Sequence, residues 1–206
     1  MESTIGTRGT LIAKKHKTAV GPGLRWKLKN TLRFGFLWGW LTNWLAIWFS
    51  RLTGIRTIRS ELRARKNHPD GTIVDFGVLG YREVTDAGVA FLVDDWDDDS
   101  TDITDFDYHG CGTVNTAEDQ TQTALEGEVG TATVTREAGT ATQPNAYDLL
   151  STATQAFSGS AAVVEHGLFS ADTGGTMWDR TMFATITVAN GESITWAYTV
   201  TFTAGS

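Results

Sequence analysis

The alternation of hydrophobic and polar residues in the C-terminal two thirds of the chain predicts β-strands. It is clearest in the last strand, where one face carries Ile194, Trp196, Tyr198, Val200 and Phe202. The other face carries Thr195, Ala197, Thr199 and Thr201. A strict period of two indicates one buried face and one face that meets water or a second layer.

Similar signals recur every 8–12 residues between residues 56 and 206. They predict strands at about 57–66, 72–80, 131–136, 146–157, 161–170 and 176–184. Turns are expected at residues 68–71 and 172–175, and Asn190-Gly191 is a strong hairpin signal. Residues 85–94 predict a short helix capped by Thr85 or Asp86. Many short strands with such turns favour a mainly β fold, an antiparallel β-sandwich of jelly-roll-like type.

The N-terminal region follows a different pattern. An extended basic arm is expected up to about residue 23, followed by the start of a helix. Residues 34–50 contain no charge and lie between Arg33 and Arg51. Helical spacing relates Leu37, Leu41, Trp44, Trp48 and Leu52. The tryptophans of this region are Trp26, Trp38, Trp40, Trp44 and Trp48.

Three interpretations of this apolar segment remain open: a helix buried between protein subunits, a helix on a membrane surface, and a membrane span. Tryptophan and arginine are enriched at protein interfaces. They also suit an interfacial membrane helix. A span needs about 20 apolar residues, and Asn43 in the middle weighs against it. The segment starts too far from residue 1 for a signal peptide.

Charge is divided along the chain in the same way. Residues 1–68 hold 14 Lys and Arg and two acids, whereas residues 69–206 hold three bases and 22 acids. These blocks of +12 and −19 together give the net charge of −7. We therefore predict a basic anchor region at 1–55 and an acidic sandwich domain at 56–206. A nucleic-acid role for the basic residues 8–33 stays open.

Acidic residues are densest between positions 94 and 107. This run could be a solvated loop that keeps the surface soluble, or its carboxylates could bind Ca²⁺. The calcium candidates are Asp94, Asp95, Asp97, Asp98 and Asp99. Their spacing differs from that of an EF-hand, and no other cofactor is expected.

No enzyme signature is found in the sequence. Cys111 is expected to be a small buried residue, and His109 and His166 to be structural hydrogen-bonding groups. The glycine-rich residues 108–113 lack the lysine of a P-loop and predict a tight turn. Gly159-Ser160 lacks the pattern of a nucleophile elbow.

Residues 161–202 resemble a C-terminal pattern of tailed-bacteriophage virion proteins. The matching positions are Glu165, Gly167, Leu168, Phe169, Gly174, Gly175, Thr176 and Arg180. Residues 109–113, with Ala117, Leu125 and Glu126, are similar to the middle section of that group, and the N-terminal arm is similar to its longer members. The resemblance implies a structural virion protein of the head surface or the tail, without enzymatic activity.

The same residues allow two local expectations. Leu168 and Phe169 should lie on opposite faces of a strand, with one in the core and the other against a neighbouring subunit. Arg180 is one of three bases in the acidic domain, and Glu165 across the hairpin is its expected partner. An exposed pair of this kind would contribute only about 0–1 kcal/mol.

The preferred function is therefore a capsid-associated decoration or cement protein, made in the host cytoplasm and located in the virion. It would be present in several copies and would bind other capsid or tail proteins, because an exposed apolar segment favours assembly. The alternatives are a tail, baseplate or fibre component, and a membrane-anchored module that binds a ligand such as a glycan.

Overall fold

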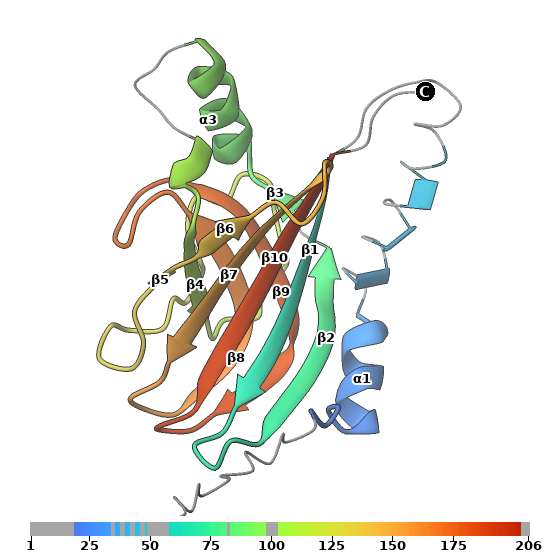
Figure 1. Ribbon diagram of the computed structural model, residues 1–206, viewed down its shortest axis with the longest axis vertical. Coiled ribbons are helices and arrows are strands. Elements are labelled where there is room, and N and C mark those ends of the chain that lie inside the picture. Colours follow the sequence, from blue (N-terminus) through green and yellow to red (C-terminus); the bar gives the residue numbers. More distant parts are fainter. Residues whose placement is uncertain are drawn as a thin grey trace, which may run out of the picture.

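The computed structural model describes residues 19–33, 36–37, 40–41, 44–45, 48, 58–81, 83–97 and 103–202. Two five-stranded antiparallel sheets pack face to face (Figure 1). Sheet A has the order β2 (Ile73–Tyr81), β1 (Ile58–Asn67), β10 (Ser193–Phe202), β7 (Asp148–Ala156), β6 (Thr140–Thr142). Sheet B has the order β3 (Glu83–Val84), β9 (Met177–Val188), β8 (Ala161–Phe169), β4 (Tyr108–Gly112), β5 (Glu137–Ala138). The predicted mainly β sandwich is confirmed, and the jelly-roll-like detail stays a prediction.

The hydrophobic core fills the space between the sheets. In β10, Ile194, Trp196, Tyr198 and Val200 are buried, as the period of two predicted. Phe202, at the end of this face, is half exposed because the strand here reaches the rim of the sandwich. The predicted strands near 57–66, 72–80, 146–157 and 161–170 are confirmed as β1, β2, β7 and β8.

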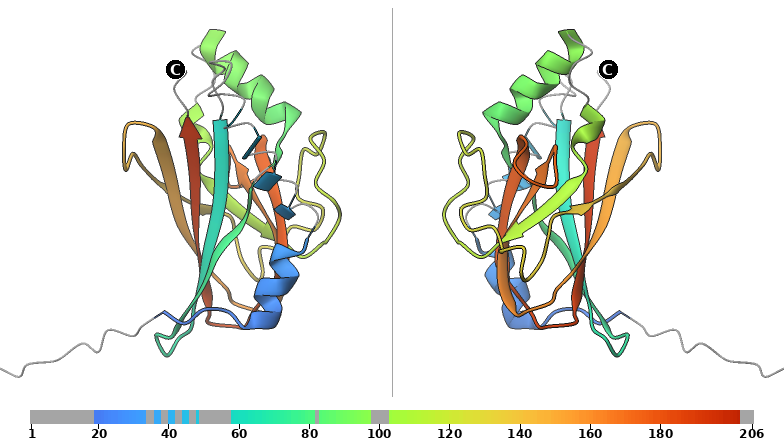
Figure 2. Two further views of the ribbon diagram at one scale, coloured as in Figure 1. Left: turned by 90° about the vertical axis from the view of Figure 1, so that its right-hand side faces the viewer. Right: turned by 90° about the vertical axis from the view of Figure 1, so that its left-hand side faces the viewer.

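Helices α1 (Leu24–Thr31) and α3 (Asp86–Asp97) lie toward opposite ends of the sandwich (Figure 2). The second begins where predicted, and Thr85 is its cap, because the Gly88 N–H donates to Thr85 Oγ1 at 3.0 Å. A short 3-10 helix, Ile103–Asp105, precedes β4.

Two local predictions were wrong. Residues 108–113 do not form a tight turn, since Tyr108–Gly112 is the strand β4, hydrogen-bonded between β8 and β5. Residues 131–136 are not a strand but a loop that begins with a turn, in which the Thr133 N–H donates to Gly130 O. The β-branched alternation of this segment buries Val134 in the core without adding a strand.

The Asn190-Gly191 signal predicted the turn correctly but not the pairing. Gly191 has a φ of 83°, which favours glycine. The strands that flank it, β9 and β10, belong to different sheets and do not pair. The turn instead crosses the edge of the sandwich and bonds to Phe157, which donates to Glu192 O and accepts from the Gly191 N–H.

Candidate functional site

The tryptophans of the apolar segment 34–50 that the structure describes are exposed. Residues 36, 37, 40, 41, 44, 45 and 48 have helical backbone. Trp40, Trp44 and Trp48 are 52%, 55% and 53% exposed, and Leu37, Leu41 and Leu45 are also exposed. Trp38 and Arg51 lie outside the described residues. A continuous anchor helix therefore stays a prediction, but an apolar surface on this part of the chain is observed.

Trp26 is not part of that exposed surface. Its indole N–H donates to Ala184 O at 3.1 Å and to Thr185 O at 3.0 Å, and its ring packs on Phe76. It therefore binds α1 to the chain's own sandwich. Arg33 follows this helix, and burial lowers the pKa of its guanidinium. The division of the chain at residue 55 stays a prediction, although α1 packs on the sandwich.

The Glu165–Arg180 pair is present and is buried, not exposed. Arg180 Nε donates to Glu165 Oε2 at 2.7 Å, and the two side chains are 1% and 0% exposed. Arg180 Nη1 also donates to Ala117 O and Gln122 Oε1, while Glu165 Oε1 accepts from the Gly127 N–H. The pair therefore fixes the 113–136 loop to the outer face of sheet B.

Leu168 and Phe169 lie on opposite faces of β8, as predicted, and both are buried. Leu168 is in the core between the sheets, whereas Phe169 packs with Leu125 and Met177 on the outer face of sheet B. Phe169 therefore contacts its own chain and not a neighbouring subunit. The Arg136 guanidinium lies 3.4 Å from the centre of its ring, a cation–π contact.

Glycines make room for the buried groups on this face. A Cβ on Gly167 or on Gly110 would lie 2.9 Å from the Phe169 ring, and one on Gly112 would overlap the Glu165 carboxylate. Gly174 and Gly175, with φ of 63° and 68°, form the β8–β9 turn, where Arg136 donates to Gly174 O. Glu165, Gly167, Phe169 and Arg180 thus contribute together to the cover on the outer face of sheet B.

The acidic run does not form a metal site among the residues described. Asp94, Asp95 and Asp97 lie in α3, and Asp98 and Asp99 lie outside the described part of the chain. No cluster of three or more His, Cys, Asp or Glu side chains suited to a metal ion is found in the described residues. The calcium hypothesis therefore gains no support from the geometry.

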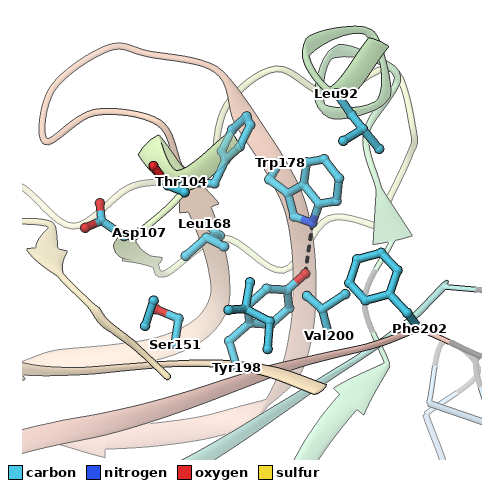
Figure 3. A pocket seen from close by; sticks show the side chains of 12 residues that line it. Leu92, Thr104, Asp107, Ser151, Leu168, Trp178, Tyr198, Val200 and Phe202 are labelled. Carbon is cyan, nitrogen blue, oxygen red and sulfur yellow. Dashed lines mark hydrogen bonds between the residues drawn. The ribbon is translucent and has the colours of Figure 1, made fainter. Parts of the chain in front are cut away.

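An apolar cavity of about 140 Å³ opens between the two sheets next to α3 (Figure 3). Its wall comes from α3, from the segment before β4, and from strands of both sheets. The lining residues are Leu92, Thr104, Phe106, Asp107, Ala141, Leu149, Ser151, Leu168, Trp178, Tyr198, Val200 and Phe202. A dry cavity of about 150 Å³ is large enough for a benzene ring. This site can therefore hold one small aromatic or aliphatic group.

The few polar groups of the cavity are held by the fold. The Trp178 N–H donates to the Tyr198 hydroxyl at 2.9 Å, across the space between the sheets (Figure 3). Asp107 Oδ1 is buried and has no hydrogen-bond partner in the described structure, and burial raises the pKa of this carboxyl. The site consequently offers one carboxyl in an otherwise apolar wall.

Behind the cavity, a buried polar chain links the sheets. Ser151 Oγ lies 2.9 Å from His109 Nε2, and His109 Nδ1 lies 3.0 Å from His166 Nε2. Both imidazoles are fully buried, and the His166 ring packs on Trp196. The prediction that these histidines are structural hydrogen-bonding groups is confirmed. Cys111 is also buried as predicted, and burial raises the pKa of its thiol far above the usual range.

The sequence did not predict the cavity. Its lining residues are separated by more than 100 positions, and several lie in ordinary core positions of strands. The alternation of buried and half-buried residues in β7 and β10 gives no information on a void between the two sheets.

Within the part of the chain that the structure describes, no helix has the length and apolar character needed to cross a membrane. Comparisons of the chain with protein-family models, with curated proteins and with solved structures find no significant match.

Proposed function

We propose that the protein is a non-enzymatic structural protein of a tailed-phage virion, associated with the capsid as a decoration or cement protein. The sandwich projects from the shell, and the N-terminal region attaches it to other virion proteins. The observation that carries this proposal is the set of half-exposed indoles at Trp40, Trp44 and Trp48, in a chain whose sandwich has its own hydrophobic core.

Exposed apolar surface of this kind is costly on a single copy in water. Monomeric proteins rarely expose several large apolar side chains together, and such patches mark interaction sites. The basic charge of the N-terminal region and the acidic charge of the sandwich also favour assembly, because copies attract end to end and repel side by side. These features support a protein that works in an assembly.

The resemblance of residues 161–202 to phage virion proteins supports the choice of assembly. In this chain the pattern residues Glu165, Phe169 and Arg180 cover the outer face of sheet B with the chain's own loop. A sheet sealed in this way suits a protein that stands on a particle surface. A tail, baseplate or fibre component remains the alternative within the same class.

The cavity favours a second candidate, a membrane-anchored module that binds a small ligand. The two functions differ in how the protein purifies. A virion protein copurifies with particles without detergent, whereas a membrane-anchored module requires detergent to stay in solution.

Mass spectrometry of purified particles, with heads and tails separated, tests the proposal. The protein is expected in the head fraction at many copies. Recovery in tails would favour the tail alternative, and absence from both fractions would overturn the virion proposal.

A further inference from the structure

Acidic residues neighbour the wall of the interior cavity along the chain, although most of that wall is apolar. Asp107 lies in the wall itself, and the exposed residues Asp94 and Asp105 lie within two positions of the lining residues Leu92 and Phe106. Among the described residues, no Lys or Arg lines the cavity. The cavity therefore favours an apolar side chain that belongs to a positively charged segment.

The N-terminal region of this chain has that composition. The exposed indoles of Trp40, Trp44 and Trp48, here called the Trp stripe, recur every four residues, a spacing that places side chains on one side of the predicted helix. Arg33 and Arg51 flank them, and the sequence contains no acidic residue between Glu2 and Glu61. The Trp stripe thus combines large aromatic rings with flanking sequence whose only charged residues are basic.

The cavity size limits what can enter. A cavity of about 140 Å³ is close to the size that holds one benzene ring, so it can take the six-membered ring of an indole, with the five-membered ring at the mouth. Within one copy the stripe leaves about half of each indole in water, and none of its residues lines the cavity. A six-membered ring that enters the cavity of another copy would meet Leu168, Trp178 and Tyr198.

We propose that one indole of the Trp stripe inserts into the interior cavity of a second copy of this chain. This rests on the proposed role as a multi-copy shell protein and names the partner of its N-terminal region. The contact joins two different surfaces, so it is heterologous and builds a closed ring or an open chain. Each copy contributes one stripe and one cavity.

Two variants of the full chain separate the halves of this contact. Replacing Trp40, Trp44 and Trp48 together with Ala removes the stripe, whereas Leu149→Trp fills the mouth of the cavity from a half-exposed position. Ala141→Trp fills the same cavity from an exposed position on the edge strand β6, in case Leu149→Trp does not fold. Circular dichroism and thermal unfolding establish that each variant retains the fold.

Matched controls leave both halves intact. Leu24, Leu28 and Leu32 are exposed apolar residues of α1 and its end, so their triple replacement with Ala controls for loss of apolar surface. Leu28→Trp adds an indole far from the cavity. Both controls are expected to assemble like the unchanged chain.

Sedimentation velocity measures the oligomeric state of the purified chain and of each variant. The unchanged protein is expected to form oligomers, and each variant to self-associate at least about tenfold more weakly. A one-to-one mixture of the stripe variant and the cavity variant should form a dimer and nothing larger, because only one complementary contact remains.

The proposal is overturned if the unchanged chain is monomeric at every concentration, if the cavity variants assemble normally, or if the mixture stays monomeric. Assembly in solution does not depend on a particle. Loss of this contact together with recovery in phage heads would therefore refute the inference and leave the proposed function standing.

Discussion

Arg180 and Glu165 form an ion pair that is diagonal across β8 and β9 and almost completely buried on the outer side of sheet B. One carboxylate oxygen, Oε2, accepts from the Arg180 guanidinium at 2.7 Å, and the other, Oε1, accepts from the Gly127 N–H at 3.0 Å. The pair joins two strands to a long loop, so its loss should affect both the stability of the fold and the order of that loop.

Glu165→Gln is expected to destabilise the protein by about 3–5 kcal/mol, because the Arg180 guanidinium would be left buried without its counter-charge. Urea unfolding of the purified chain measures the change. Hydrogen exchange should also speed up at the Gly127 amide, which loses a charged acceptor.

Arg65→Gln provides the matched control. Arg65 pairs with Asp75 at 3.0 Å, but the two side chains are 63% and 33% exposed, so its loss should cost less than about 1 kcal/mol. Equal effects of the two substitutions would show that burial does not determine the value of the Glu165–Arg180 pair.

Sequence reasoning predicted this pair because so few bases occur in the acidic domain, but it did not predict the burial. The cover comes from residues 113–136, which have little regular structure and no periodic signal. The same cover explains why β4 was mistaken for a turn. Gly110 and Gly112 suggest a turn when taken alone, yet they are glycines because Phe169 and Glu165 occupy the space that a Cβ would need.

The strands with one buried face and one solvent-facing side were the most predictable part of the fold. In β10 every second residue from Ile194 to Val200 is buried, and the alternation alone predicted which face of the strand is buried. The Asn190-Gly191 turn was equally clear, but a turn signal does not say whether its two strands share a sheet. Whether β9 and β10 share a sheet depends on contacts between residues distant in sequence, such as those of Phe157 with the turn.

Asn30 connects α1 to the edges of both sheets and provides a second prediction. Its Nδ2 donates to Leu79 O on β2 at 2.9 Å, and its Oδ1 accepts from the Ala184 N–H on β9 at 3.0 Å. Asn30→Ala leaves both buried backbone groups without partners, which should cost about 1–3 kcal/mol.

Faster hydrogen exchange at the Ala184 amide would confirm that the loss is local to this contact. Thr31→Ala is the control, because the exposed Thr31 hydroxyl bonds only within α1, to Lys27 O. An unchanged stability of Asn30→Ala would mean that α1 is not held by this side chain.

Glu192 should make the stability of the sandwich sensitive to acid. Its carboxylate accepts from the Ala189 N–H at 2.8 Å and pairs with Lys66 and with His68. Burial acts to raise the pKa of Glu192, but the Ala189 N–H, Lys66 and His68 outweigh it and hold the pKa below the usual range.

Because the folded pKa is lowered, the stabilisation is complete above the unfolded value of about 4.3 and is lost as the pH falls through the folded pKa. Urea unfolding between neutral and acidic pH should show this loss in the natural chain. Glu192→Gln should remove that part of the pH dependence, whereas Glu137→Gln, at an exposed position, should leave it unchanged. An identical acid profile for Glu192→Gln would contradict the assignment.

Trp196 tests the register of the sandwich most directly. It is fully buried, its N–H donates to Gln155 Oε1 at 2.7 Å, and its ring packs on His166 and Phe183. Trp196→Asp would remove a side chain whose truncation alone costs about 3–5 kcal/mol and would add an unpaired charge to the core. We expect no cooperative unfolding transition in circular dichroism. Thr199→Lys, on the half-exposed opposite face, should fold normally. A stable, folded Trp196→Asp protein would mean that the two faces of β10 have been assigned the wrong way round.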